Sequence, residues 1–321
     1  MVSAPAMSRL SRRIEIDAPA KINLFLDVLG RRAGGYHDLR SVVVPVAVCD
    51  RVTLAAAEAG IEVTVEGPFA GTAAEPLIQP HENLAARAAR ALKDVSGHPG
   101  GVRIRLEKNI PVGGGLGGGS ADAAAVLAGL NRLWGLEMSA ADLVAIAPRL
   151  GCDVPSLLHG GAVLMEGLGE TVSGIGADPG AGERRWWVVL VNPGFRVSTK
   201  DVYERYCETL TSGGADVNDM VLALRGGDMA RAVRSLYNRL QPTVFRKFPI
   251  LQIMAEALEE AGAAGVLLAG SGASLFGMAW DEGHANQVAA RAAASLGFPL
   301  WCKVTRTLPD GVMAAHGPLE A

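Results

Sequence analysis

The residues best suited to chemistry form a glycine-rich loop that leads into a helix-forming stretch. Six glycines stand within residues 113–119, Ser120 and Ala121 follow, and residues 121–133 are rich in Ala and Leu, which favour helix. A backbone without side chains can approach a ligand closely. The helix N-terminus behind it presents free N–H groups and the positive end of the helix dipole. The pattern therefore predicts an anion site, usually occupied by phosphate, and it is unlike a flexible linker.

Two common nucleotide motifs do not account for this loop. Gly113, Gly115 and Gly118 satisfy G-x-G-x-x-G, but that match alone is weak. Residues 102–107 (VRIRLE) alternate apolar and charged side chains, as in a strand with one solvent-exposed face. The strand before a dinucleotide loop is instead buried on both faces. A Walker loop is excluded because no Gly-Lys-Ser/Thr follows the glycines. A third class of phosphate-binding glycine loop remains.

Two charged residues far from the loop are further candidates for chemistry. Lys21 lies in an apolar, strand-like stretch, where a lysine is costly unless it is paired. It either reaches solvent from an edge strand or pairs with a carboxylate inside a site. Asp153 precedes Val-Pro, and an Asp in that position is typically a turn or cap residue. The residues by themselves leave these alternatives open.

Four motifs resemble, in the same order, those of the GHMP kinases, the family of galactokinase, homoserine kinase and mevalonate kinase. The loop at residues 111–122 (PVGGGLGGGSAD) is similar to the nucleotide loop of this family. The other three narrow the resemblance to members that phosphorylate a cytidine diphosphate sugar alcohol: residues 19–26 (PAKINLFL) with 34–39 (GGYHDL), 151–155 (GCDVP) and 270–274 (GSGAS). Ala121 departs from the pattern, because many members have a second serine there.

This resemblance implies an α+β chain with the two-domain GHMP kinase fold. It implies a ribosomal-S5-like N-terminal domain over residues 10–175, a ferredoxin-like C-terminal domain over residues 176–321, and an active site in the cleft between them. The glycine-rich residues 174–183 are the expected boundary. The implied activity is ATP-dependent phosphorylation of a hydroxyl of 4-diphosphocytidyl-2-C-methyl-D-erythritol, in non-mevalonate isoprenoid precursor biosynthesis.

The resemblance also assigns roles to individual residues. Asp153 is expected to act as acid/base, and Lys21 to pair with it and stabilise the transferred charge. The expected ATP site comprises Pro111, Gly113, Gly114, Gly115, Leu116, Gly117, Gly118, Gly119, Ser120 and Ala121. The expected acceptor site, with cytosine stacked between tyrosines and hydrogen-bonded by a histidine, comprises Asn23, Tyr36, His37, Thr199, Tyr203 and Gly272. Mg²⁺ accompanies ATP, and Ser120 with the phosphates is its expected ligand.

Other functions stay open at this point. Another GHMP kinase could act on a small alcohol such as mevalonate or homoserine, although Tyr36 and His37 would then have no base to stack on or bind. A nicotinamide-dependent oxidoreductase is disfavoured by the alternating strand at residues 102–107. A nucleotide-binding protein without catalytic activity is disfavoured by the joint presence of Lys21 and Asp153.

Composition limits the partners and the compartment. The chain has 321 residues, 49% hydrophobic and 20% charged, which suits two globular domains. A net charge of −3 without a dense basic run argues against nucleic acid. Four widely spaced cysteines favour reduced thiols in the cytoplasm and no zinc site. The sequence shows neither a signal peptide nor an apolar run of roughly 20 residues, so no membrane partner is expected. A small-molecule substrate is expected, and the chain is expected to be a monomer or a homodimer.

The elements that must position these residues follow from hydrophobic periodicity and turn signals. Strands are expected at residues 14–16, 22–29, 41–55 (one or two strands), 61–66, 102–107, 161–166, 186–191, 265–269, 275–279 and 301–305. Helices are expected at residues 83–95, 121–133, 139–150, 199–210, 216–224, 228–237, 250–261 and 285–296. Pro155 is expected to prevent helix after Asp153.

Overall fold

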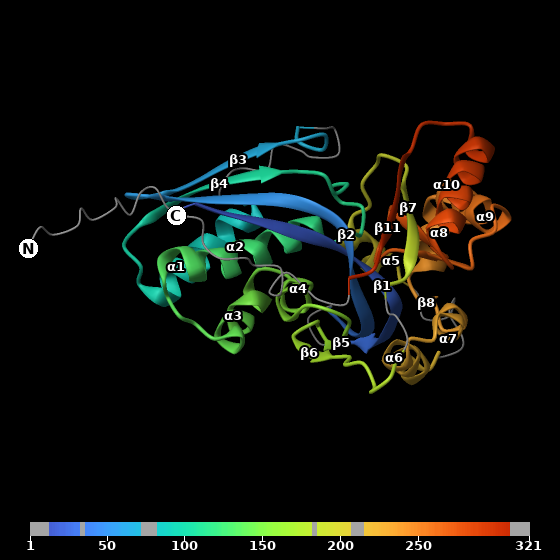
Figure 1. Cartoon of the computed structure of the whole chain (residues 1–321), viewed down its shortest axis with the longest axis horizontal. Helices are drawn as coiled ribbons and strands as arrows, with labels where there is room; N and C mark the ends of the chain where they lie inside the picture. Colours follow the sequence, from blue (N-terminus) through green and yellow to red (C-terminus); the bar gives the residue numbers. More distant parts are fainter. Residues whose placement is uncertain (1–12, 33–35, 72–81, 182–184, 207–214, 309–321) are drawn as a thin grey trace, which may run out of the picture.

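The structure, a computed structural model, describes residues 13–32, 36–71, 82–181, 185–206 and 215–308. Its strands and helices interleave along the chain and lie in two units beside each other (Figure 1). The strands are β1 (Arg13–Arg31), β2 (His37–Ala57), β3 (Ile61–Glu66), β4 (Gly101–Glu107), β5 (Val163–Gly167), β6 (Thr171–Gly174), β7 (Trp187–Asn192), β8 (Tyr237–Asn238), β9 (Gly265–Leu268), β10 (Leu275–Ala279) and β11 (Trp301–Arg306). The helices are α1 (Leu84–Ser96), α2 (Gly118–Trp134), α3 (Ala140–Ile146), α4 (Val154–His159), α5 (Thr199–Arg205), α6 (Val217–Gly226), α7 (Met229–Arg234), α8 (Gln241–Lys247), α9 (Pro249–Glu260) and α10 (Glu282–Leu296), with a 3₁₀ turn at Ala147–Arg149.

The first unit is a sheet with helices on one face. Its strands follow the order β3-β4-β2-β1-β8, with β5 on β2 and β6 on β5. The helices α1 to α4 cover the sheet on the side shown below it in Figure 1. Polar side chains alternate with buried ones along β4, because the opposite face of these strands meets solvent. The expectation of a half-exposed strand before the glycine loop is confirmed.

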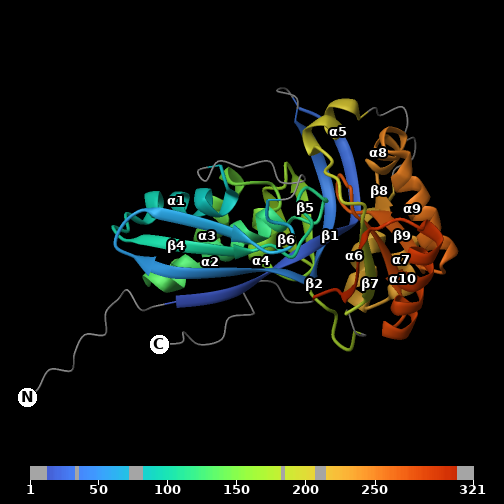
Figure 2. The same cartoon turned by 90° about the horizontal axis from the view of Figure 1, so that it is seen from above.

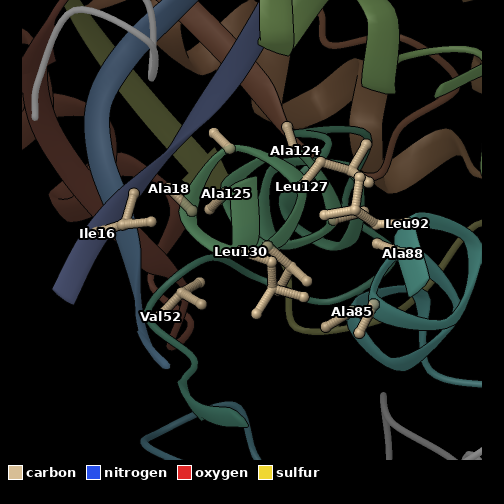
Figure 3. Packing of buried hydrophobic residues seen from close by; sticks show 14 of the residues in the cluster. Ile16, Ala18, Val52, Ala85, Ala88, Leu92, Ala124, Ala125, Leu127 and Leu130 are labelled. Atoms are coloured by element: carbon tan, nitrogen blue, oxygen red, sulfur yellow. The ribbon is translucent and has the colours of Figure 1, made fainter. Parts of the chain in front are cut away.

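Helix α2 is the centre of the first core. Its inward residues are mostly alanines, with Leu127 and Leu130, and they meet the inward side chains of β1, β2 and α1 (Figure 3). The small side chains let the helix approach the sheet closely. A Cβ added at Gly129 would lie 2.4 Å from Leu54 Cδ1 and 2.5 Å from Ile16 Cδ1. The alanine-rich sequence after the loop thus seats the helix, and with it the loop, against the sheet.

The strands β1 and β2 connect the two units. They pair antiparallel from one end to the other, with bulges at Pro19/Ala20 and Asn23/Phe25, and Figure 2 shows them running out of the first unit and along the second. At its start β1 alternates exposed and buried residues, whereas residues 18–28 are all buried. The alternation ends at residue 18 because both faces of the strand are covered by other elements from there on.

The second unit is an antiparallel sheet in the order β11-β7-β10-β9, with α9 and α10 packed against it. Of the short helices in this unit, α6 contacts β1 and β2, and α8 contacts α5 and α9 (Figure 1). The two-residue strand β8 pairs parallel with β1, so the second half of the chain adds a strand to the first sheet. The described residues between β6 and β7, 175–181 and 185–186, contain no strand, and the boundary at residue 175 stays a prediction.

Most of the expected elements are confirmed, with several corrections. Residues 228–237 were expected to be one helix, but α7 ends at Arg234 and Tyr237 enters β8. The helix expected over residues 199–210 ends at Arg205, and residues 207–210 lie outside the described residues. Helix α8 and strand β6 were not expected.

A further correction is α4, because Pro155 lies at the start of a helix rather than ending one. The missing N–H of Pro155 costs nothing in the first turn. Within the described residues, no helix has the length and apolarity to span a membrane.

Candidate active site

A cleft of about 480 Å³ lies between the glycine loop, β1, the start of α4 and the second unit. Its lining combines the loop with charged and aromatic side chains that are distant in sequence. Besides Pro111 to Gly115 and Gly117 to Ser120, the lining includes Lys21, Asn23, Ser41, Leu84, Leu106, Lys108, Ile110, Asp122, Cys152, Asp153, Met165, Thr199, Tyr203, Gly270 and Ser271. A sequence with several separate motifs therefore forms one site.

The glycine loop has the geometry of an anion cradle. Gly113, Gly115 and Gly117 have φ of +67°, +79° and +72°, a region that suits glycine. Gly117 is the N-cap of α2 and supplies no capping side chain, so the first N–H groups of the helix are available to a ligand. A Cβ at Gly115 would lie 2.1 Å from Ala269 O. The loop therefore depends on glycine both for its turns and for its contact with the second unit.

Lys21 and Asp153 form an ion pair beside this loop. Lys21 Nζ lies 3.3 Å from Asp153 Oδ2 and donates a hydrogen bond to Asn23 Oδ1 at 2.9 Å. Lys21 and Asn23 are two residues apart on β1, so they point to the same face. Lys21 is only 4% exposed, so the alternative of a lysine that reaches solvent is wrong. Asp153 occupies the N-cap position of α4 but its side chain makes no capping bond, so the carboxylate is directed at Lys21 instead.

A chain of hydrogen bonds fixes the position of Lys21 in this ion pair. Asn23 Nδ2 donates to Ser41 Oγ at 2.8 Å, and Ser41 Oγ donates to the carbonyl of Phe25 at 2.8 Å. The backbone N–H of Lys21 donates to Leu116 O in the glycine loop at 2.9 Å. The ammonium is thus fixed relative to both β1 and the loop. The sequence analysis named Asn23 as an acceptor contact, and the structure also makes it a direct partner of Lys21.

Helix α5 brings the aromatic part of the site to the cleft. Tyr203 lines the cleft, and the ring of His37 stacks on it with centroids 5.4 Å apart. Burial, with a smaller contribution from the charge of Asp153, raises the pKa of Tyr203 well above its ordinary value. Thr199 Oγ1 lies 2.8 Å from Ser271 Oγ, which joins α5 to the second glycine loop that contains Gly272. Tyr36 is 68% exposed and is not among the described residues that line the cleft.

The residues suit ATP with its magnesium ion. The free N–H groups at the start of α2 are complementary to phosphate oxygens. Ser120 stands in the same turn, lines the cleft and lies close to Gly151, where an added Cβ would be 3.7 Å from Ser120 Oγ. Among the described residues no group of three or more His, Cys, Asp or Glu side chains gathers as a metal site. A hydroxyl together with phosphate oxygens is an ordinary magnesium environment.

Comparison with known proteins agrees with this geometry. Residues 83–161 match the family model "GHMP kinases N terminal domain" and residues 220–297 match "GHMP kinases C terminal". A 4-diphosphocytidyl-2-C-methyl-D-erythritol kinase of Pelotomaculum thermopropionicum is 43% identical, over 85% of this chain and 92% of that protein. The enzyme of the same name from Symbiobacterium thermophilum is 42% identical, over 84% of this chain and 92% of that protein.

The chain belongs to the GHMP kinase family. A crystal structure of 4-(cytidine 5'-diphospho)-2C-methyl-D-erythritol kinase is 35% identical and superposes with a TM-score of 0.73, covering 92% of this chain and 99% of the other. Homoserine kinase from Cytophaga hutchinsonii has the same TM-score at 20% identity, which shows a shared fold. The expected GHMP kinase fold, mixed α+β in two domains, is confirmed.

Sequence reasoning missed part of this GHMP kinase site. Lys108, Asp122 and Asp50 form a buried ionic cluster under the glycine loop, and Ser41 and Ser271 line the cleft. A signal was available for two of them, since Lys108 ends an alternating strand and Asp122 directly follows the loop. Asp50 carried no local signal, because its partners lie far away in the sequence.

Proposed function

We propose that this chain is an ATP-dependent kinase that phosphorylates a hydroxyl of 4-diphosphocytidyl-2-C-methyl-D-erythritol in isoprenoid precursor biosynthesis. The observation that carries the proposal is the ion pair of Lys21 with Asp153, 3.3 Å apart, at the edge of the glycine loop. The names of the relatives supply the substrate. The low charge density and the spaced cysteines suit an enzyme that acts in the cytoplasm on a small molecule.

The geometry suits direct transfer of a phosphoryl group from ATP to the acceptor. Asp153 takes the proton of the acceptor hydroxyl as that oxygen bonds to the terminal phosphorus of ATP, and the bond from this phosphorus to the bridging oxygen breaks to release ADP. Lys21 faces the same space and stabilises the negative charge on the transferred group. Asn23 fixes the direction of the ammonium through its hydrogen bond. This arrangement positions the reacting groups and needs no covalent intermediate.

The glycine loop holds the donor in this proposal. N–H groups of Gly118, Gly119 and Ser120 at the start of α2 bind phosphate oxygens, and Ser120 together with the phosphates holds Mg²⁺. Mg²⁺ held there would supply positive charge that offsets the negative charge of the phosphates. Ala121 is fully buried, so its side chain packs against the core of α2 and supplies no hydroxyl to the ligand.

The acceptor lies on the other side of the Lys21–Asp153 pair, against α5. The ring of Tyr203 lines the cleft and provides a face on which a pyrimidine can stack. His37, whose ring lies against Tyr203, can hydrogen-bond the edge of that base. Tyr36 is exposed beside His37 and covers the base from outside. Thr199 and Gly272, next to Ser271, contact the remainder of the acceptor. These acceptor contacts rest on the family motif and on the position of the residues around the cleft.

The test is a coupled assay for ADP release with three acceptors in parallel: 4-diphosphocytidyl-2-C-methyl-D-erythritol, mevalonate and homoserine. We expect turnover with the first acceptor only, and formation of its monophosphate by mass spectrometry. Asp153→Asn serves as the control for contaminating kinases, because it should abolish the signal. Turnover with mevalonate or homoserine instead would contradict the proposed substrate, and no turnover with any acceptor would contradict the proposed activity.

A further inference from the structure

A buried ionic cluster under the glycine loop has no part in the chemistry described so far. The ammonium of Lys108, directly after β4, pairs with the carboxylate of Asp50 on β2 and lies 2.5 Å from Oδ2 of Asp122, the fifth residue of α2. The side chains of Asp50, Lys108 and Asp122 are 0%, 6% and 5% exposed. Such a cluster is costly to bury, and apolar residues of similar volume often give equal or greater stability. Its presence therefore calls for a reason other than stability.

The contacts of the cluster lie at both ends of the loop. At the entry, Asp50 Oδ1 accepts hydrogen bonds from the backbone N–H groups of Asn109 at 2.6 Å and Ile110 at 2.8 Å. At the exit, Asp122 belongs to the helix whose N-terminus faces the cleft. Lys108 stands at the entry and binds Asp122 at the exit. One ammonium and two carboxylates thus join the two ends of a segment made mainly of glycine.

The cluster also supports the loop from below. A Cβ at Gly118 would lie 3.2 Å from Asp50 Oδ2, so the carboxylate packs directly under the first residue of α2. A glycine-rich loop loses more conformational freedom on ordering than any other segment of equal length. A fixed distance between its ends reduces the number of conformations that a nucleotide must select from, and a binding group held in advance binds more tightly.

We propose that Asp50, Lys108 and Asp122 are positioning residues for the nucleotide, which set the distance and direction between the loop entry and the N-terminus of α2. The proposal rests on the proposed function in one respect, that the loop binds MgATP. The three residues act through the loop backbone and not on the acceptor. Their loss is therefore expected to weaken ATP binding specifically, and the Lys21–Asp153 pair is expected to keep its geometry.

The experiment compares three variants of the full-length chain. Asp122→Asn removes one charge with little change in shape. The triple variant Asp50→Asn, Lys108→Met and Asp122→Leu removes all three charges together, so that no unpaired charge stays buried, and the amide oxygen of Asn at position 50 can still accept from the N–H groups of Asn109 and Ile110. Val126→Ala is the matched control: it removes buried volume from the core of the same helix and leaves the three charges of the cluster unchanged.

The measurements are the dissociation constant for MgATP by calorimetry, the KM for the acceptor at saturating ATP, and the melting temperature. We expect the dissociation constant for MgATP to rise by about tenfold or more in both cluster variants, the scale for groups that orient a binding site without touching the ligand. The acceptor KM of the cluster variants should stay within about twofold of that of the unmodified chain. Val126→Ala should lower the melting temperature without weakening the binding of MgATP. Hydrogen exchange of residues 109–119 should become faster in the cluster variants only.

Four results would overturn the proposal. ATP affinity that follows the melting temperature across all variants would make the cluster merely structural, as would an unchanged affinity in a stable triple variant. An equal rise in the dissociation constant for MgATP and in the acceptor KM would mean damage to the whole cleft and would contradict a role specific to the nucleotide. If the unmodified chain binds no MgATP, the proposed function fails, and the positioning role fails with it.

Discussion

The ammonium of Lys21 on β1 contacts the carboxylate of Asp153, the N-cap residue of α4, at 3.3 Å. Neither residue has another ionic partner of opposite charge among the described ion pairs. The lysine is buried and the carboxylate is partly open to the cleft, with side-chain exposures of 5% and 30%. The open partner is the one that must meet the substrate hydroxyl. This asymmetry underlies the first prediction.

Replacing Asp153 by Asn is expected to lower kcat by about 10²-fold or more, because the amide cannot accept the proton of the acceptor hydroxyl. The affinity for MgATP should change little, since Asp153 does not belong to the glycine loop. Steady-state kinetics and calorimetry on the same preparation measure both quantities. A variant that retains most of its turnover would remove Asp153 from the mechanism.

Replacing Gly117 by Val is expected to abolish ATP binding in a folded protein. The reason includes a collision, because a Cβ at this position would lie 2.9 Å from Lys21 Cγ and 3.0 Å from Lys21 Cε, besides the strain of a β-branched residue at φ +72°. Gly135→Val, at φ +65° on the other end of α2 with open space around it, provides the matched control for backbone strain. Calorimetry with ATP should separate the two, and equal affinity in both variants would show that the loop is not the cradle.

The aromatic residues of the proposed acceptor site are tested by substitution of their rings. Tyr203→Ala, and by the same argument Tyr36→Ala, should lose on the order of 1–3 kcal/mol of acceptor binding, as is usual for base–aromatic stacking, whereas Tyr→Phe should be mild. His37→Ala should raise the KM of the cytidine-containing acceptor and leave the KM of ATP nearly unchanged, because a directional hydrogen bond is lost only on the acceptor side. Tyr36 is mostly exposed. If Tyr203→Ala weakens acceptor binding and Tyr36→Ala does not, the base is held by Tyr203 and His37 without Tyr36.

Nucleotides without the sugar alcohol test the base that the acceptor site recognises. CMP and CDP should inhibit competitively against the acceptor, and UMP much less, because uracil presents a carbonyl acceptor where cytosine presents an amino donor. Inhibition constants at saturating ATP measure the difference. Equal inhibition by cytidine and uridine nucleotides, or none by either, would show that the pocket beside His37 does not distinguish cytosine.

The buried cluster predicts a dependence of stability on pH. Burial raises the pKa of Asp122 to about 7 against the opposing attraction of Lys108; its Oδ1 has no hydrogen-bond partner among the described residues, whereas Asp50 accepts two backbone N–H groups. The folded chain therefore holds this proton more tightly than the unfolded chain, in which the carboxyl titrates near about 3.9. The bound proton therefore contributes its full stabilisation of the fold below about pH 3.9, and this contribution is lost as the pH rises to about 7.

Denaturant unfolding of the unmodified chain and of Asp122→Asn, at several pH values between about 5 and 8, measures this dependence. The free energy of unfolding of the unmodified chain, relative to that of the variant, should fall with rising pH up to about 7 and become constant above it. Parallel curves for the two proteins would show that Asp122 keeps an ordinary pKa in the fold.

The local pattern of the sequence determined the parts of this protein that depend on neighbours in the chain. The glycine run and the alanine-rich residues after it specify the loop and α2, because turn geometry and helix formation are local. The alternation in residues 102–107 specified a strand with one exposed face for the same reason. Ser139, with Asp142 three residues later, forms a capping box at α3. The motifs that resemble the GHMP kinases also identified Lys21 and Asp153 as candidates and implied that the two residues pair.

Only the tertiary structure decided which distant side chains meet. Pro155 was expected to prevent a helix and instead begins α4, because packing of that segment against α2 decides whether a proline stands in the first turn or in the interior. The two-residue strand β8 is too short for a periodic signal and exists only through its pairing with β1. The buried charge of Lys108 is stable only because two carboxylates from separate elements converge on it, and such convergence is a property of the packed sheet and helix, which no local pattern encodes.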